Sequence, residues 1–363
     1  ENKMKKGIVV RLYPTREQEK IINQTFGCVR LIYNTLLDYA KENKEYNRFN
    51  LQKLITTFRK EKPFLNEVDK FALQNACKNL ANGFKNYFQK RAGFPIYKSK
   101  KNSKRTYQTN VTNGNIAFNN GCIKLPKLGL VKCSDNYRDS NNKIINVTVS
   151  QNLDGKYYAS VIYETNIPPL LKTGKEVGID LGTRKLISTS EGETYHLPDK
   201  VFKQEKRCRR EQRRLSRRNK ESKRYEKQRI ILAKAYQRRK DIINDNLHKF
   251  SNSLVKEYDV IYMEDLDIKQ LLTIQDNKKK KNKMIISSLG KLVRIITYKA
   301  NMYDKQIHKI NRYYPSSQIC SHCQKRHDIG DKEKYICPYC GAEIDRDINA
   351  AINIKNKGQL SFS

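Results

Sequence analysis

The sequence predicts a multidomain protein of mixed class, with an α+β front half and an α/β rear half. The chain has 363 residues, which is enough for two or three domains. Apolar residues recur at helical spacing from Arg16 to about Arg91, and then in short alternating runs up to Tyr163. After a proline-containing linker at Asn166 to Gly174, short apolar strands alternate with long helical segments.

The front half is predicted to be a sheet that carries an inserted helical unit. Met4 to Tyr13 is rich in apolar residues and predicts a strand, which Pro14-Thr15 ends while capping a helix. Gly93 and Pro95 end the helical unit. The short runs from Tyr107 to Tyr163 then predict an antiparallel sheet or a small barrel, with the helices inserted after its first strand.

The rear half is predicted to contain two paired strands, a long helical hairpin, a further strand and an amphipathic helix. Apolar periodicity and the turn residues between the segments predict each element. In chain order they are Val177–Leu181 with Lys185–Thr189, Lys200 to about Leu254, Val260–Met263, and Ile286 to Ile307.

The charge of the chain predicts a polyanionic partner. Lys and Arg number 74 against 37 Asp and Glu, a formal net charge of +37. Release of condensed counterions makes nucleic acid the expected ligand of such a protein. The segment Lys200 to Lys240 carries 19 Lys or Arg and 4 Glu, a net charge of +15 over 41 residues. The alternative for this segment is a solvated helix face that binds nothing specific.

A membrane partner is not expected. The basic residues are spread over several segments without one hydrophobic anchoring face. The sequence has neither a run of eighteen apolar residues nor a recognisable secretory leader, so we expect a cytoplasmic protein.

The nine cysteines fall into two groups. Five are scattered singly and predict buried or half-buried thiols: Cys28, Cys77, Cys122, Cys133 and Cys208. The other four form two C-x2-C motifs, separated by 13 residues: Cys320-Ser-His-Cys323 and Cys337-Pro-Tyr-Cys340.

Two facing C-x2-C turns supply four thiolates in a tetrahedral arrangement, which suits one Zn²⁺ ion. Four protein ligands close the site, so the zinc is expected to be structural. Two alternatives remain open from the residues alone. The cysteines could form a redox dithiol pair, or His322 or His327 could replace a cysteine as ligand.

Three acidic residues lie where an apolar segment meets a polar one. Asp180 is part of an apolar strand, Glu264 follows another, and Asp347 lies near the start of a predicted helix. Taken singly, each is more often a helix cap or a surface charge. If the three converge, their oxygens suit two Mg²⁺ ions of the kind that cleave phosphodiesters. The neighbouring Asp265, Asp267 and Asp345 are assigned to caps or the surface, with Asp345 as a candidate supporting residue.

The order of the motifs adds a resemblance. GIDLGT at 178–183, YMEDL at 262–266, the two C-x2-C pairs and DRDINAAINI at 345–354 follow one another. This order resembles TnpB, the transposon-encoded RNA-guided nuclease family related to type V CRISPR effectors. The motifs cover roughly the C-terminal half, and the N-terminal half fits by length and arrangement only. Tyr335 stands where the family commonly has Trp.

The resemblance implies the domains and partners. They are a wedge-type β-barrel (1–13 and 105–170), a helical recognition domain (14–104), a RuvC-like nuclease domain of RNase H type (171–310 and 341–363) and a zinc ribbon (311–340). Asp180, Glu264 and Asp347 would be the catalytic, magnesium-binding residues. A guide RNA derived from the transposon end and target double-stranded DNA would be the partners, with the protein as a monomer on its RNA.

Three other functions stay open at this point. One is a transposase or resolvase of RNase H type that cuts DNA without RNA. A second is an RNA-guided DNA-binding protein that does not cleave, although all three acids are present. A third is a zinc-ribbon nucleic-acid-binding protein without enzymatic activity.

Overall fold

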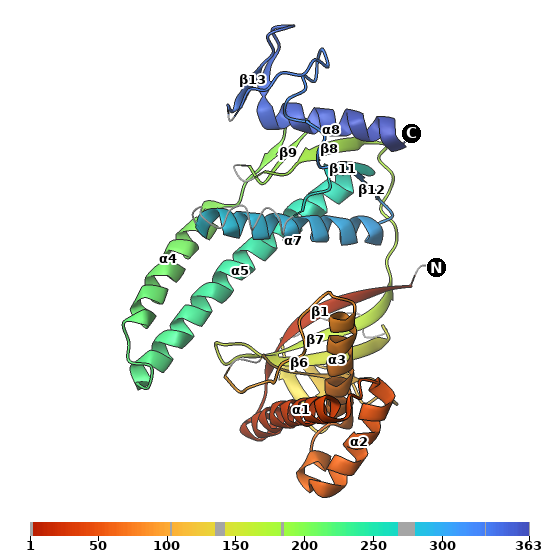
Figure 1. Cartoon of the computed structure of the whole chain (residues 1–363), viewed down its shortest axis with the longest axis vertical. Coiled ribbons are helices and arrows are strands. Elements are labelled where there is room, and N and C mark those ends of the chain that lie inside the picture. Colours follow the sequence, from red (N-terminus) through yellow and green to blue (C-terminus); the bar gives the residue numbers. More distant parts are fainter. Residues whose placement is uncertain are drawn as a thin grey trace. The chain divides into compact units, whose positions relative to one another are not determined.

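The computed structural model describes residues 3–101, 104–134, 142–182, 185–267, 280–330 and 332–362. The chain divides into two compact units, Glu1–Asn166 and Ile167–Ser363, each with its own hydrophobic core (Figure 1). The division falls at the start of the predicted linker. Within the described ranges, none of the helices combines the length and apolar character that crossing a bilayer requires.

The first unit is a seven-stranded antiparallel sheet with helices inserted between its first and second strands, as predicted. The sheet has the order β2-β6-β7-β1-β5-β4-β3. Its elements are β1 (Lys3–Tyr13), α1 (Arg16–Asn43), α2 (Arg48–Glu61), η1 (Pro63–Asn66), α3 (Lys70–Phe88), β2 (Arg105–Asn110), β3 (Ala117–Asn119), β4 (Cys122–Leu125), β5 (Gly129–Cys133), β6 (Ile144–Gln151) and β7 (Tyr157–Asn166). The described strands pair in an open order, so the closed barrel stays a prediction.

Local sequence explains the first unit. Thr15 caps α1 through a capping box. Its hydroxyl accepts from the Gln18 N–H at 3.3 Å, and its own N–H donates to Oε1 of the Gln18 side chain. The buried faces of α1 and α3 join the sheet in one core. Phe84 is part of that core at 1% exposure, whereas Phe88 is 57% exposed. The inner face of α3 therefore ends at Phe84, and the last residue of the helix lies at the surface.

The second unit contains a mixed five-stranded sheet of order β10-β9-β8-β11-β12. Strands β8, β11 and β12 are parallel, and β9 and β10 are antiparallel to their neighbours. The elements are β8 (Glu176–Asp180), β9 (Ile187–Thr189), β10 (Thr194–Tyr195), α4 (Asp199–Ser216), α5 (Lys223–Glu257), β11 (Val260–Glu264), α7 (Lys280–Met302), β12 (Gln306–Ile310), β13 (Lys334–Ile336), β14 (Glu343–Asp345) and α8 (Arg346–Phe362).

Helices cover both faces of this sheet (Figure 1). On one face, Val177 and Ile179 of β8 share a core with α5 and α7. On the other face lies α8, whose Ile354 packs with Tyr262 of β11. The alternation of side chains along each strand explains how one strand serves two cores.

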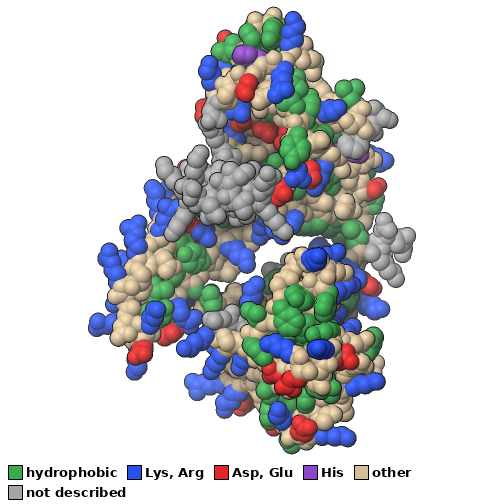
Figure 2. Space-filling model, viewed as in Figure 1, with side chains coloured by type: hydrophobic (Ala, Val, Ile, Leu, Met, Phe, Trp, Pro, Cys, Tyr) green, Lys and Arg blue, Asp and Glu red, His purple; other side chains and the backbone are tan. Residues whose placement is uncertain are grey.

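The predicted basic hairpin is confirmed as α4 and α5, which pack against each other. Gln228 on α5 donates to the buried Glu211 carboxylate on α4 at 2.9 Å. Figure 2 shows Lys and Arg side chains distributed along this hairpin.

One predicted helix is present but ends earlier than predicted. The helix expected to run from Ile286 to Ile307 begins at Lys280 and ends at Met302, and Gln306–Ile310 forms the strand β12. Asp304 adopts a left-handed conformation (φ 57°) that turns the chain out of the helix. Strand β12 then pairs in parallel with β11 along its whole length.

Candidate metal centres

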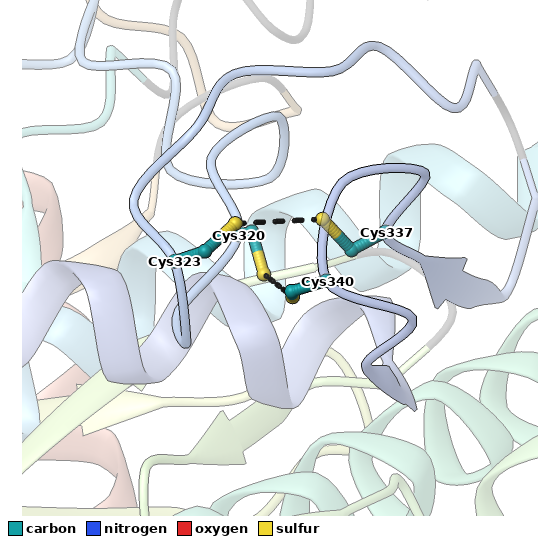
Figure 3. Close-up of side chains that lie close together, drawn as sticks. All are labelled: Cys320, Cys323, Cys337 and Cys340. Atoms are coloured by element: carbon teal, nitrogen blue, oxygen red, sulfur yellow. Dashed lines mark hydrogen bonds between the residues drawn. The ribbon is translucent and has the colours of Figure 1, made fainter.

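The four predicted zinc ligands come together. The sulfur atoms of Cys320, Cys323, Cys337 and Cys340 all lie within 4.8 Å of one another. Figure 3 shows the four side chains gathered from two turns. The Sγ atoms of Cys320 and Cys340 are 3.7 Å apart, and those of Cys323 and Cys337 are 3.6 Å apart. A tetrahedral zinc site with Zn–S bonds of ~2.3 Å needs sulfur separations of about 3.8 Å. The cluster therefore fits one Zn²⁺.

Backbone hydrogen bonds close each C-x2-C turn. The Gln324 N–H donates to the Cys320 carbonyl, and the Gly341 N–H donates to the Cys337 carbonyl, both at 2.9 Å. Burial raises the pKa of the Cys337 thiol, but backbone N–H groups and the neighbouring thiols outweigh it and lower that pKa. At Cys340 a backbone N–H lowers the pKa, but the neighbouring thiols outweigh it and raise that pKa. Thiols this close compete for protons, and a metal ion bound by four thiolates would remove that competition.

The alternatives for this cluster fit the structure less well. His322 is exposed and does not belong to the four-residue group. The separations of 3.6–3.7 Å exceed a disulfide bond of ~2.05 Å, so neither pair is a disulfide, and all four sulfur atoms gather in one group where a redox dithiol would need only two. Tyr335, at the position where Trp was expected, fills the ribbon core at 0% exposure and donates its hydroxyl to the Gln318 carbonyl at 3.1 Å.

The other cysteines behave as predicted. Four are buried and one is half-buried, and none belongs to the zinc cluster: Cys28, Cys77, Cys133 and Cys208, and Cys122.

Asp180 and Glu264 end neighbouring parallel strands. Ile179 of β8 pairs with Met263 of β11, so the next residue on each strand, an acid in both cases, reaches the carboxyl edge of the sheet together. Neighbouring strands lie about 4.8 Å apart, and residues in register point to the same face. In open α/β sheets this edge is where ligands bind.

The third acid comes from α8. Asp347 lies in its first turn, and the helix lies directly on β8 at Gly178. A Cβ atom added to Gly178 would lie 2.1 Å from the Ala351 carbonyl oxygen, so only glycine permits this approach. The glycine stands two residues before Asp180. It is thus one reason why the helix that carries Asp347 can lie beside the strand that carries Asp180.

Electrostatics reflect the convergence of the three acids. Burial, followed by repulsion from Glu264 and then from Asp347, raises the pKa of Asp180 to about 7. Burial also raises the pKa of Glu264, although a hydrogen bond from Ser316 opposes the shift. Half-buried carboxylates that repel one another need a cation or a proton.

Lys185 provides one cation beside these acids. Its ammonium lies 3.6 Å from Asp347 and 2.5 Å from Asp345. Asp345 also accepts from the N–H groups of Asp347 and Ile348. It therefore caps α8, in agreement with its predicted assignment as a helix cap. Asp265 pairs with Lys309 and Arg312 at the surface, again as predicted.

The two clusters differ in tightness. Within the part of the chain that the structure describes, the cysteines are the one group whose ligand atoms lie close enough to share a single ion. The three carboxylates interact, but they do not form such a group.

Several neighbours of these sites were not predicted. Ser316 donates to Glu264 at 2.7 Å, and the buried Asn349 and Asn353 bond to backbone near the first cysteine pair. A signal was available for the asparagines, because their spacing of four residues puts both on one face of the predicted helix. A glycine inside an apolar strand likewise signals a close approach at Gly178.

Three family models match the chain. Residues 159–275 match the IS605 OrfB family described as "Probable transposase". Residues 290–354, which include the cysteine cluster, match "Cas12f1-like, TNB domain", and residues 4–48 match a "Helix-turn-helix domain" of the same OrfB family.

Relatives match over nearly the whole chain. A "Putative RNA-guided DNA endonuclease" of Streptomyces pristinaespiralis is 32% identical, over 98% of this chain and 90% of the relative. "Putative RNA-guided DNA endonuclease InsQ" of Escherichia coli K12 is 28% identical, over 96% and 91%. Among solved structures, the "Cas12f1-sgRNA-target DNA complex" matches with a TM-score of 0.60 at 13% identity, covering 98% of this chain and 99% of that one. The likeness to this structure confirms a multidomain mixed α/β fold of the Cas12 kind, and the relatives show that the chain belongs to the TnpB family, the IS605 OrfB proteins.

Proposed function

We propose that this protein is an RNA-guided DNA endonuclease associated with a transposable element, and that Asp180, Glu264 and Asp347 form its cutting site. The observation that carries the proposal is the meeting of three acids, distant in sequence, at the carboxyl edge of one sheet. The names of the relatives and the fold shared with a guide-RNA and DNA complex support RNA guidance.

The domain assignment follows from the same proposal. Residues 1–13 and 105–170 would form the wedge domain, 14–104 the recognition domain, 171–310 and 341–363 the RuvC-like nuclease domain, and 311–340 the zinc ribbon. Two topological features support it. Helices α1 to α3 lie between β1 and β2 in the chain, and the cysteine pairs lie between β12 and α8.

The donor set fits hard divalent cations. Asp180, Glu264 and Asp347 offer only oxygen ligands, which Mg²⁺ prefers. Burial, followed by the charges of Glu264 and Asp347, raises the pKa of Asp180, and a bound cation would offset both effects. Two Mg²⁺ ions held there would supply activation of water and stabilisation of the leaving oxygen.

The α4–α5 hairpin is the surface that we assign to nucleic-acid phosphates. Three of its four glutamates already pair with arginines within the hairpin: Glu205, Glu211 and Glu226. These pairs leave most of the 19 cations in Lys200 to Lys240 in excess. Backbone contacts of this kind position a duplex, while pairing with the guide supplies the choice of sequence.

The test is cleavage by three single variants, Asp180→Ala, Glu264→Ala and Asp347→Ala. Each is expected to lose Mg²⁺-dependent cleavage of a duplex that matches the co-purifying RNA, by a factor of at least ~10³, since each removes a ligand. RNA binding should survive. Asp265→Ala is the matched control, because it removes the acid adjacent to Glu264 that pairs with surface cations.

Other outcomes identify the other functions. Cleavage by wild-type protein stripped of RNA would indicate a transposase or resolvase that acts directly. RNA-directed DNA binding without cleavage by the wild type would indicate a guided binding protein. Full cleavage by Asp180→Ala would falsify the assignment of the three acids.

A further inference from the structure

Ser316 lies at the root of the first cysteine turn and touches one of the proposed metal ligands. Its hydroxyl donates to Oε1 of Glu264 at 2.7 Å, and the residue is only 6% exposed. A carboxylate with one oxygen fixed by a buried hydroxyl has a defined orientation, with Oε2 left available for another partner. Hydrogen bonds of this kind commonly set the orientation and basicity of metal-binding carboxylates.

The segment 316–321, which we call the ribbon root, is fastened to α8 by two asparagines. Asn353 donates its amide to the carbonyls of Ser316 (2.8 Å) and Ile319 (2.6 Å). Asn349 donates to the Ile319 carbonyl at 2.7 Å and accepts from the Ser321 N–H at 2.9 Å. Both asparagines are fully buried. Buried amides without these partners would be costly, so the ribbon root is held firmly.

These contacts join the two centres through one helix. α8 carries Asp347 in its first turn and, on the following turns, the asparagines that hold the ribbon root. The ribbon root in turn carries Ser316, which holds Glu264, and the fully buried zinc ligand Cys320. Because Ser316 is only four residues before Cys320, a displacement of the first cysteine turn would also move the hydroxyl that holds Glu264.

We propose that Ser316 is a positioning residue that orients the Glu264 carboxylate for a divalent cation, and that Ser316 is held in place by Asn349 and Asn353 of α8 on one side and by the zinc-bound first cysteine turn on the other. The zinc centre would then set the cation affinity of the cutting site in addition to stabilising the ribbon. This inference rests on the proposed function, since it takes Glu264 as a cation ligand.

The experiment measures Mn²⁺ binding to zinc-loaded, RNA-free full-length protein by electron paramagnetic resonance. Ser316→Ala is expected to weaken Mn²⁺ binding about 10- to 100-fold, the usual effect of removing such a supporting hydrogen bond. Ser316→Thr, which keeps the hydroxyl, should restore most of the affinity. Ser321→Ala is the matched control, because its buried hydroxyl has no partner among the described residues, and it should bind Mn²⁺ as the wild type does.

Asn349→Ala gives a second variant that touches neither carboxylate. It should weaken Mn²⁺ binding in the same direction, and it decides the matter if Ser316→Ala does not fold. Zinc content and the thermal unfolding midpoint are measured for each variant. Wild-type affinity in a folded Ser316→Ala protein, or in Asn349→Ala if that is the one that folds, would overturn the inference.

An additional variant separates this inference from the function that it assumes. If Asp180→Ala leaves Mn²⁺ binding intact, the proposed cutting site itself is wrong. If Asp180→Ala abolishes binding while Ser316→Ala matches the wild type, the cutting site stands and the role of Ser316 is wrong.

Discussion

The cysteine cluster and the carboxylate cluster gather their ligands in opposite ways. The four cysteines lie within 21 residues, from Cys320 to Cys340, and two short turns bring their sulfur atoms within 4.8 Å of one another. The three acids come from two strands and a helix spread between Asp180 and Asp347. The first cluster is local and closed by its own ligands, whereas the second depends on the packing of the whole second unit.

The hydrophobic cores beneath the two clusters also differ: the ribbon core is small and local, and the core under the carboxylates is large. Besides its cysteines, the ribbon core contains Tyr335, Ile329, Ala342 and Ile344. The carboxylate cluster stands on a large core shared by β8, β11, α5 and α7. A small core cannot offset the entropy of an ordered chain without a metal, whereas a large one can. The ribbon should therefore need its ion in order to fold, and the sheet should not.

The largest expected effect is the loss of a cysteine ligand. In Cys337→Ser the ribbon should unfold, because structural zinc contributes on the order of 10 kcal/mol to folding such modules. Limited proteolysis should cut within residues 311–345, and metal analysis should find no bound zinc. Cys122→Ser removes a half-buried thiol outside the cluster and should resist proteolysis like the wild type. A Cys337→Ser protein that keeps its zinc would refute the difference between the two clusters.

The same difference governs what the sequence could predict. Two C-x2-C pairs at a spacing of 13 residues are specific by themselves, because turn geometry alone brings the thiols together. The convergence of the acids depends on strand register and on Gly178, which are tertiary features. Taken singly, each acid is more often a helix cap or a surface charge, and the neighbouring Asp345 is indeed a cap. The prediction that the three acids belong to one site came from the order of the motifs along the chain and not from any single acid.

The error at β12 has a related cause. Ile296, Ala300, Tyr303 and Ile307 follow one another at helical spacing, and all pack on the core of the second unit. Residues of α7 and of strand β12 both pack in that core, so the spacing of apolar residues alone does not show where α7 ends. The end of the helix is determined by the pairing of β12 with β11, a contact that the sequence of 296–310 alone does not reveal. The positions of Ser316 and Lys185 beside the acids were equally hidden.

Gly178→Ala tests the long-range part of the comparison. The added methyl group would meet the Ala351 carbonyl at 2.1 Å, so α8 must move away from β8. We expect a loss of about 1–3 kcal/mol in the free energy of unfolding, together with cleavage reduced at least ~10-fold as Asp347 is displaced. Gly27→Ala is the control, because its added Cβ meets nothing within 4 Å in helix α1. It should be neutral or stabilising.

Zinc content gives a further readout for this pair of variants. The ribbon ligands come from the turns and not from the face of α8 that meets β8, so Gly178→Ala should retain stoichiometric zinc. Loss of zinc together with the displacement of α8 would mean that the cysteine cluster is less local than its spacing indicates.

Asp180→Asn should cause the smallest of these changes in the free energy of unfolding, and the sign of that change with pH can be worked out. The pKa of Asp180 is raised from 3.8 to about 7 by burial and by its neighbouring acids. Below pH ~4 the side chain is neutral in both the folded and the unfolded chain. As the pH rises to about 7 the unfolded chain loses its proton first, so the fold loses stability. In magnesium-free buffer with zinc retained, Asp180→Asn should escape that loss and be about 1–2 kcal/mol more stable than the wild type at pH 8.

Asp265 supplies a control with the opposite sign. Hydrogen bonds from Lys309 and Arg312 lower its pKa, so its contribution to stability is present at neutral pH and is lost as the pH falls through that lowered pKa. Asp265→Asn should therefore be less stable than the wild type at pH 8, where Asp180→Asn is more stable. Denaturant unfolding at pH 5 and pH 8 measures both. Equal stability of Asp180→Asn and the wild type at pH 8 would mean that neither burial nor the neighbouring carboxylates penalise the charged form of Asp180 in the metal-free protein.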